Sequence, residues 1–150
     1  MLLVNLAARL RSSRDRAQRA ERRLIEAIET IPDGFVLFDS EDRLVTCNAA
    51  YREVYSTTAD KIRPGVRFEQ LLRLGLERGQ HRVPEGERED WLKTRLANHK
   101  TPSGSQEQMI DSGRWLRFVE RRTADGGVVG IRTDITELSP CGIVPGRSVF

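Results

Sequence analysis

Residues 106–134, QEQMIDSGRWLRFVERRTADGGVVGIRTD, decide the fold of this chain. The stretch divides into three β-prone segments, which are residues 106–111, 114–122 and 128–134. Two short turns separate them, at Ser112-Gly113 and at Ala124-Asp125-Gly126-Gly127. The second turn is a strong hairpin signal, because glycine tolerates the positive φ that tight turns require. The sequence therefore predicts three consecutive strands joined by short turns.

Two more strands are predicted before this stretch. Residues 35–39 (FVLFD) and 43–47 (RLVTC) are short β-prone runs, and the polar residues between them indicate a hairpin. Asn48 suits the N-cap of a short helix over residues 49–55, because its side chain can accept a hydrogen bond from a free N–H in the first turn. We therefore expect a hairpin that leads directly into a short helix.

Helical periodicity fills the region between the two groups of strands. Apolar residues recur at helical spacing from Phe68 until Gly79, and a further helix is expected over residues 84–98 with Trp91 in its buried stripe. The order is two strands, several helices and three strands. It predicts an α+β fold, in which a five-stranded antiparallel sheet packs against short helices.

The first 31 residues show a heptad pattern. Leucine, isoleucine and alanine occupy positions 3, 10, 17, 24 and 31, and leucine, serine and alanine occupy the intervening positions 6, 13, 20 and 27. One long amphipathic helix is predicted, ended by Pro32-Asp33-Gly34. It is either a surface helix folded back on its own domain or a parallel coiled coil joining two protomers. Its polar, arginine-rich face favours the coiled coil, with an expected dimer interface of Leu3, Leu6, Leu10, Ala17, Ala20 and Leu24.

The positive charge of the chain is concentrated in that helix. The formal net charge is +3, but residues 9–23 alone hold seven arginines against Asp15 and Glu21. This segment therefore carries about +5, and the rest of the chain carries about −2. We expect no nucleic-acid partner, because the globular part offers no basic footprint.

Cysteine usage and hydropathy bear on the compartment. Cys47 and Cys141 match neither a disulfide framework nor metal-ligand spacing, which fits free thiols in a reducing cytoplasm. The apolar start, residues 1–8, is much shorter than the roughly 20 residues that span a bilayer. Because it runs straight into arginines, it could also be the cytoplasmic end of a membrane helix. Membrane anchoring of a parent protein is therefore expected only through an upstream segment.

Two segments of the chain resemble the PAS domain family. Residues 31–55, IPDGFVLFDSEDRLVTCNAAYREVY, resemble the opening of a PAS domain. Residues 113–138, GRWLRFVERRTADGGVVGIRTDITEL, resemble its closing strands. The second segment contains Asp134-Ile135-Thr136, a signature that in this family precedes the helix leading to a histidine kinase or a diguanylate cyclase. The resemblance extends over about residues 24–138.

This resemblance implies a sensory module that performs no chemistry of its own. Residues 1–31 would form the N-terminal helix, residues 32–138 the PAS domain, and residues 139–150 an irregular tail. We expect a cytoplasmic homodimer that regulates a histidine kinase of a two-component system by rearranging its flanking helices. The alternatives are a ligand-free dimerisation module and the input domain of a diguanylate cyclase. The expected signalling residues are Asp134, Ile135 and Thr136.

The cofactors of two family branches find little support in the residues. The flavin-binding branch uses a cysteine in the helical region, and no cysteine occurs between Asn48 and Pro140. Haem-binding relatives place an axial histidine on the long helix beside the sheet, whereas His81 follows Gly79 and is expected in a solvated loop. His99 lies at a helix end, where a cation complements the helix dipole. We therefore expect neither flavin photochemistry nor haem.

Catalytic and metal-binding motifs are absent from the sequence, which contains no GxSxG, HExxH, CxxC or phosphate-binding GxxxxGK[ST] pattern. A pocket is instead expected between the sheet and the helices. Its lining should be largely apolar, so that it takes either a small apolar ligand or none. A slip of one residue in a strand would exchange the two faces of that strand. The candidate lining residues are Leu37, Val45, Tyr51, Tyr55, Phe68, Leu72, Leu116, Phe118, Val129 and Ile131.

Overall fold

The computed structural model describes residues 2–138 of the chain, which divides into two compact units between Pro32 and Asp33. The first unit is one helix, α1 (Leu2–Thr30), which confirms the long N-terminal helix predicted from the heptads. None of its side chains is buried. Over residues 2–138, no helix combines the length and the apolar character needed to cross a membrane. The predicted irregular tail, residues 139–150, lies outside the described residues.

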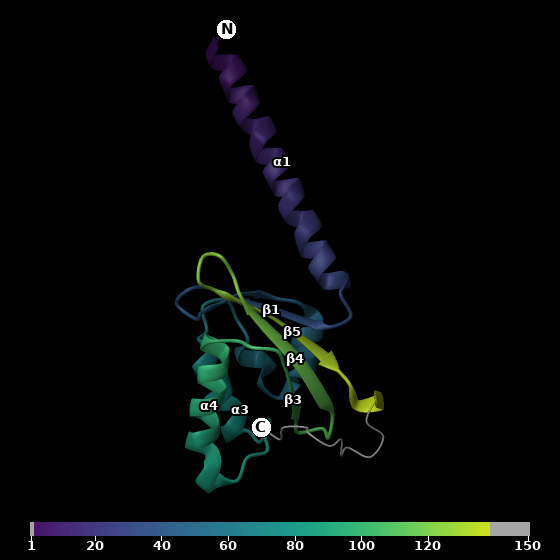
Figure 1. The fold of residues 1–150 in the computed structure, drawn as a ribbon. Helices are drawn as coiled ribbons and strands as arrows, with labels where there is room; N and C mark the ends of the chain where they lie inside the picture. The colour runs from purple at the N-terminus through teal and green to yellow at the C-terminus, as the bar shows by residue number, and fades with distance from the viewer. Residues whose placement is uncertain (1, 139–150) are drawn as a thin grey trace. The chain divides into compact units, whose positions relative to one another are not determined.

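A five-stranded antiparallel sheet forms the centre of the second unit (Figure 1). The order across the sheet is β2-β1-β5-β4-β3, so the first strand pairs with the last. In that pairing Phe35 lies opposite Ile131. All five strands predicted from the sequence are present, and they are β1 (Gly34–Phe38), β2 (Leu44–Cys47), β3 (Ser105–Met109), β4 (Trp115–Arg122) and β5 (Val128–Asp134).

Helices connect β2 to β3, and α3 and α4 lie together beside the sheet in Figure 1. The three α-helices are α2 (Ala49–Val54), α3 (Phe68–Glu77) and α4 (Arg88–Lys100). Each lies within a few residues of its predicted range. A 3₁₀ helix at Ser56–Lys61 was not predicted from the sequence, and two shorter 3₁₀ turns lie at Glu85–Glu87 and Thr136–Leu138.

Asn48 caps α2, as the sequence predicted. Its Oδ1 accepts a hydrogen bond from the backbone N–H of Tyr51 at 3.0 Å. The same oxygen accepts from the N–H of Phe35 at 2.8 Å, and Nδ2 donates to the carbonyl of Asp33 at 2.9 Å. Asn48 is only 1% exposed. This one side chain therefore ties the start of α2 to the start of β1.

Alternate strand residues face the helices and build the core. Val36 and Phe38 of β1 are fully buried, as are Leu116 and Phe118 of β4. The helices supply the opposite wall of the core with Phe68, Leu71, Leu72, Trp91 and Leu92. The core therefore lies between one face of the sheet and the helices, and we call that face of the sheet the inner face.

Four residues predicted to line the pocket lie on the outer face instead. Leu37 alternates with the buried positions of β1, and Val129 and Ile131 alternate with those of β5. Val45 of β2 is 45% exposed. The predicted parity of these strands is therefore wrong by one residue. Both faces of β1 carry apolar side chains, so alternation of polarity could not decide which side faces the helices.

Candidate functional site

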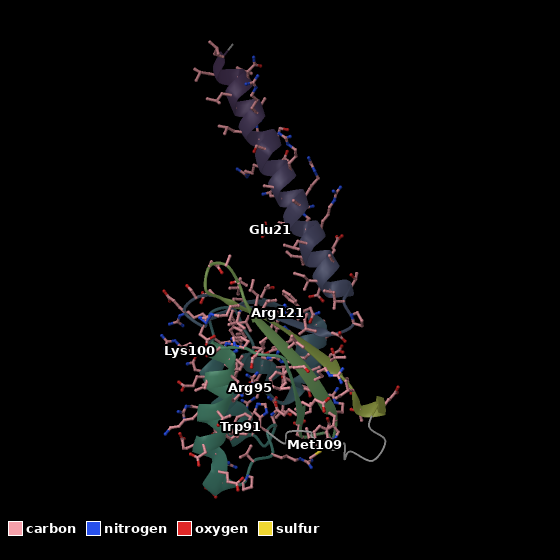
Figure 2. All side chains as sticks on the ribbon, viewed as in Figure 1. Glu21, Trp91, Arg95, Lys100, Met109 and Arg121 are labelled. Carbon is pink, nitrogen blue, oxygen red and sulfur yellow. The ribbon has the colours of Figure 1, made fainter. Side chains whose placement is uncertain are left out.

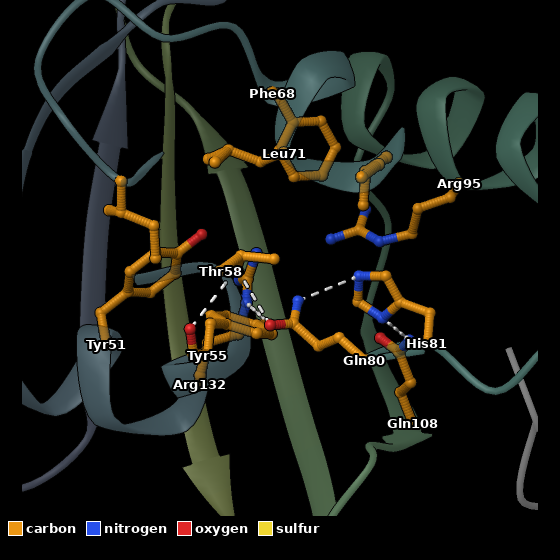
Figure 3. A pocket seen from close by; sticks show the side chains of 12 residues that line it. Tyr51, Tyr55, Thr58, Phe68, Leu71, Gln80, His81, Arg95, Gln108 and Arg132 are labelled. Atoms are coloured by element: carbon orange, nitrogen blue, oxygen red, sulfur yellow. Dashed lines mark hydrogen bonds between the residues drawn. The ribbon is translucent and has the colours of Figure 1, made fainter. Parts of the chain in front are cut away.

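A small cavity lies between the helices and the inner face of the sheet (Figure 3). Its volume of about 20 Å³ has room for roughly one water-sized group. Half of the residues around it are polar or charged, and they come from segments far apart in the sequence. These polar residues are Thr58, Gln80, His81, Arg95, Gln108 and Arg132.

One buried carboxylate joins the elements beside this cavity. Oε1 of Glu120 on β4 accepts a hydrogen bond from Nη1 of Arg95 on α4 at 2.9 Å. Oε2 of Glu120 accepts from Nη2 of Arg132 on β5 at 2.9 Å. The same Oε2 lies 3.1 Å from Nδ1 of His99. None of the four side chains is more than 4% exposed. Glu120 therefore holds α4 against two adjacent strands.

His99 extends these contacts to the turn between β1 and β2. Its Nε2 lies 2.6 Å from Oδ1 of Asp42, whose backbone φ is 62°. We call Asp42, Arg95, His99, Glu120 and Arg132 the ionic cluster. Burial by itself would lower the pKa of His99, but hydrogen bonds to Asp42 and Glu120 raise the pKa above its ordinary value. A protonated His99 can donate from both ring nitrogens, one to each carboxylate.

Glu120 is held in its ionised form. Burial alone would raise the pKa of this carboxyl, but Arg132, Arg95 and His99 hold the pKa well below its usual range. A carboxylate that accepts several charge-assisted hydrogen bonds behaves in this way, because the bonds favour its charged form. The inner face of the sheet therefore contains a permanent negative charge surrounded by cations.

Aromatic rings enclose the ionic cluster. The His99 ring stacks on Phe68, with centroids 3.7 Å apart and 16° between the planes. The Arg95 guanidinium carbon lies 4.3 Å from the Phe118 centroid, and that of Arg132 lies 5.1 Å from the same ring. Such contacts attract cations and keep water away from them. Charges in this setting interact more strongly than they would in water.

A neutral histidine closes another side of the cavity. Burial lowers the pKa of His81 to about 3. Its Nδ1 lies 2.7 Å from the Gln108 amide, and its Nε2 lies 3.4 Å from Nε2 of Gln80. Oε1 of Gln80 accepts from the Thr58 hydroxyl at 2.9 Å, which leaves Nε2 of Gln80 to donate to the ring. The atom of Gln108 at that distance is its Nε2, and a neutral imidazole accepts a hydrogen bond at only one of its two ring nitrogens.

The expectation that His81 is a solvated loop residue is wrong. Its side chain packs on Trp91 with ring centroids 5.0 Å apart, and its backbone bridges to Ile110. Figure 2 shows Trp91 and Arg95 on the side of α4 nearest the sheet. Gly79, with φ of 75°, turns the chain back toward the core just before His81. This left-handed glycine is the physical reason that a histidine following a helix end becomes buried.

A large cofactor does not fit this site. Both ring nitrogens of His81 already lie against glutamine amides, so neither is available as an axial ligand for haem iron. A cavity of about 20 Å³ also has no room for a porphyrin or a flavin ring. Among residues 2–138, no group of three or more histidine, cysteine, aspartate or glutamate side chains could hold a metal ion.

Arg132 is the most deeply buried cation of the ionic cluster, at 1% exposure. Nε donates to the Tyr55 hydroxyl at 3.0 Å, and Nη2 donates to Glu120. Nη1 is buried and has no hydrogen-bond partner within the described part of the chain. A Cβ atom at Gly130 would lie 2.7 Å from Nη1. Glycine at position 130 therefore leaves the space that the guanidinium occupies on the inner face.

The structure brings together only part of the predicted pocket. Tyr51, Tyr55, Phe68 and Leu72 line the cavity as expected. Leu116 and Phe118 face the same core without lining the cavity. Leu37, Val45, Val129 and Ile131 are not among its lining residues, for the reason of strand parity given above. The lining is also more polar than expected, which removes the basis for proposing an apolar ligand.

Sequence reasoning missed the ionic cluster, although one signal was available. Along β4, Glu120 continues the alternation of Leu116 and Phe118, and along β5 Arg132 continues that of Val128. A charged residue in phase with buried apolar positions is unusual, because burying a charge is costly unless it is paired. Two such residues of opposite sign on neighbouring strands would have indicated a buried ion pair.

The Asp134-Ile135-Thr136 signature closes the last strand. Oδ1 of Asp134 accepts hydrogen bonds from the N–H of Thr136 at 2.9 Å and from its hydroxyl at 2.5 Å. The Thr136 hydroxyl in turn accepts from the N–H of Trp115 at 3.0 Å, and Ile135 is 1% exposed. Nη1 of Arg114 lies 3.8 Å from Oδ2 of Asp134. The signature therefore fixes the direction in which the chain leaves the sheet.

Comparison with known proteins identifies the family that the sequence matches. Residues 28–139 match the PAS fold family. The non-motile and phage-resistance protein of Caulobacter vibrioides is 35% identical over 130 residues, which are 85% of this chain and 14% of that protein.

Two solved structures are similar to this one. The PAS domain of an HTR-like protein from Haloarcula marismortui superposes with a TM-score of 0.50 at 13% identity, over 83% of this chain and 99% of that one. A domain of a sensory box sensor histidine kinase/response regulator from Geobacter sulfurreducens gives a TM-score of 0.49 at 21% identity. That match covers 79% of this chain and 94% of the Geobacter chain.

Proposed function

This chain belongs to the PAS fold family, and we propose that it is the sensory input module of a longer protein in which it regulates an output domain. A PAS domain is a sensory module that is generally non-catalytic. The chain spans 14% of the length of its Caulobacter relative. The output that we propose is the histidine kinase of a two-component system, which is the kind of protein named for the Geobacter neighbour. A diguanylate cyclase is the alternative output.

The observation that carries this proposal is the polar cavity beside the ionic cluster. Arg95 and Arg132 line the cavity and also donate to Glu120. An input that changes the cavity therefore acts directly on the charges that join α4, β4 and β5. A ligand shifts a two-state equilibrium only by the difference between its affinities for the two states. Buried charges make that difference in affinity large, because they interact more strongly than charges in water.

The flanking segments give this change a route to the output. Arg132 lies two positions before Asp134, which shapes the exit from β5. Gly34, at the start of β1, pairs with Arg132, so the entry to the sheet lies next to the same residue. We propose that ligand binding, or strain from an upstream domain, moves these two ends and thereby the flanking helices.

We further propose that α1 dimerises as a parallel coiled coil. Its heptad positions are apolar or small and none of its side chains is buried, so a second copy would cover the stripe. Replacing Leu10 and Leu24 with glutamine should convert dimers to monomers in sedimentation velocity. The matched control replaces Val4 and Ile25, which lie outside the proposed interface and occupy the same heptad position as each other. Unchanged dimers after the Leu10 and Leu24 substitutions would exclude this interface.

The regulatory function is tested by fusion to a histidine-kinase core. Residues 1–138 joined in heptad register to the kinase should confer an autophosphorylation rate that depends on the PAS module. Glu120→Gln should change that rate, because it disturbs the ionic cluster, whereas Glu107→Gln on the outer face should not. Equal rates for both variants and the parent fusion would contradict a regulatory role.

A ligand-free dimerisation module remains the second hypothesis, since the cavity is small. Native mass spectrometry of the purified chain distinguishes the two hypotheses through the mass of any retained molecule. We place the module in the cytoplasm, because its cysteines fit a reducing compartment and a two-component kinase works there.

A further inference from the structure

We propose that the proton on His99 is an input of this module, because it joins Asp42 to the buried Glu120 and its loss releases Asp42. This inference rests on the proposed sensory function and names a stimulus for it. A proton also fits the size of the site. The cavity of about 20 Å³ holds roughly one water-sized group, whereas a proton needs no such space. His99 lies where the ionic cluster meets solvent, since the Asp42 side chain is 40% exposed.

Both ring nitrogens of His99 lie against carboxylate oxygens. Nε2 lies 2.6 Å from Oδ1 of Asp42, and Nδ1 lies 3.1 Å from Oε2 of Glu120. A neutral imidazole carries one N–H, so its other nitrogen would turn a lone pair toward an oxygen lone pair. The arrangement is therefore complete only when both nitrogens carry a proton. Burial opposes the charged form, yet the hydrogen bonds to Asp42 and Glu120 raise the pKa of His99 above its ordinary value of 6.5.

Charged groups surround His99 from several elements. The members of the ionic cluster around it are Asp42, Arg95, Glu120 and Arg132. The groove beside it adds Asp39, Glu41, Arg67, Glu69, Lys100 and Arg122. β1 and α3 face His99 with the uncharged rings of Phe38 and Phe68. Histidine is the only side chain of this set whose charge ordinarily changes near neutral pH, so a change of pH in that range acts through His99.

A groove of about 380 Å³ gives solvent access to this histidine. His99 and Asp42 both line the groove, together with residues at the start of α3 and in the turn between β4 and β5. The His99 side chain is only 3% exposed, but that of Asp42 is 40% exposed. Water therefore reaches the Nε2 side of the ring at Asp42, while the Nδ1 side lies within the ionic cluster. A proton can enter or leave without opening of the core.

Deprotonation acts on the two contacts of His99 in different ways. The remaining N–H stays at Nδ1, because the Glu120 side chain is 4% exposed and a buried acceptor is costly to leave unpaired. The Asp42 carboxylate can instead turn into the groove and be hydrated. Asp42 has a φ of 62°, and its carbonyl accepts a hydrogen bond from the N–H of Phe68 at 3.1 Å. Release of this turn from α4 therefore also affects the start of α3.

The same event reaches the exit of the sheet. Loss of the His99 charge weakens the hydrogen bond that Glu120 accepts from His99 and leaves the two arginines of the ionic cluster as its cationic partners. One of them, Arg132, lies two positions before Asp134, which shapes the exit from β5. The proposal therefore connects the pH of the solvent to the end of the sheet that leads to an output domain.

The test is a pH titration of the 150-residue chain, labelled with ¹⁵N, in which NMR follows the ring nitrogens of both histidines from about pH 5.5 to about pH 9. Below the midpoint both nitrogens of His99 should carry protons, and above it only Nδ1 should. The backbone amide of Asp42 should shift with the same midpoint, which should lie above 6.5. His81 is an internal control, because its pKa of about 3 keeps the ring neutral throughout. A midpoint at or below 6.5, no midpoint in the range, a proton retained at Nε2, or an Asp42 amide that does not follow the titration would each overturn the proposal.

Two substitutions in the same turn sharpen the test. Asp42→Asn removes the carboxylate but keeps a residue that tolerates positive φ, so the chain should still fold. The midpoint of His99 should fall by about one pH unit, because an opposite charge nearby favours the protonated ring. Glu41→Gln is the matched control, since its side chain is 77% exposed and pairs with Arg43. Its midpoint should equal that of the unaltered chain, and an equal shift in both variants, or in neither, would contradict the role of Asp42.

The kinase fusion shows whether the proton is a signal. Its autophosphorylation rate, divided by that of the kinase core alone at each pH, should change around the His99 midpoint. The Asp42→Asn fusion should change at the lower pH of its own midpoint. A ratio that does not vary with pH, while Glu120→Gln still alters it, would refute the proton as the input and leave the sensory function standing. A ratio unaffected by pH and by Glu120→Gln alike would refute the sensory function, even if His99 titrates as expected.

Discussion

Replacing Glu120 with glutamine tests whether the ionic cluster holds the domain together. The amide keeps nearly the same shape but removes the charge, and its NH₂ group faces donors instead of acceptors. Arg95 and Arg132 would then stay buried without a carboxylate. Removing one partner of a buried ion pair typically costs about 3 to 5 kcal/mol. Because Glu120 accepts from three cationic side chains at 2.9 to 3.1 Å, we expect a loss in that range.

The assay is urea unfolding followed by tryptophan fluorescence. Both tryptophans of the chain, Trp91 and Trp115, are buried in the sheet-containing unit and report on it directly. The midpoint should fall while the slope stays constant, because the surface exposed on unfolding does not change. Glu107→Gln is the matched control on β3. Its ion pair with Arg117 at 3.3 Å is partly exposed and should be worth about 0.2 to 1 kcal/mol.

The outcome that refutes this reasoning is specific. If Glu120→Gln destabilises the unit by no more than Glu107→Gln does, the buried charges do not stabilise the fold. The charges of the ionic cluster would then add nothing to the stability of the unit beyond what uncharged polar side chains provide. A large loss together with an altered slope would mean that the variant changes the compactness of one of the states and that the two free energies cannot be compared.

Four further predictions concern single residues. The raised pKa of His99 means that its stabilisation is present below the unfolded value of about 6.5 and is lost as pH rises through the folded pKa, so the stability difference between wild type and His99→Gln should shrink with increasing pH. For His81, whose folded pKa is about 3, the sign is opposite, and its contribution should be lost as pH falls from about 6.5 toward 3. Asp134→Ala removes an exposed ion pair with Arg114 and two exposed hydrogen bonds from Thr136, so it should cost only about 1 to 2 kcal/mol in urea unfolding, yet should uncouple a fused kinase from its input; a larger stability loss would make it a structural residue. Gly130→Ala should destabilise by about 1 to 3 kcal/mol through the clash with the buried guanidinium, whereas Gly86→Ala, which meets no atom within 4 Å, should be neutral, and equal midpoints for both would refute the clash.

Local chemistry made much of the fold predictable from sequence. Three local features appear where they were expected, and each depends on interactions within a few positions. They are the helix at residues 2–30, the turn at residues 124–127 and the N-cap at Asn48. Short-range patterns of this kind survive folding because their hydrogen bonds close within one element or one turn.

Only the tertiary structure decided the site. His99 meets Asp42 57 positions earlier in the chain, and Arg95 meets Glu120 25 positions later. No local pattern encodes such partners, because a charge becomes tolerable in a core only when the fold brings its counter-charge to within about 3 Å. The prediction of which residues of β5 face the helices failed for a related reason. Val129 and Ile131 were expected on the inner face, but Gly130 and Arg132 lie there. The Arg132 guanidinium has room on that face because Gly130 carries no side chain.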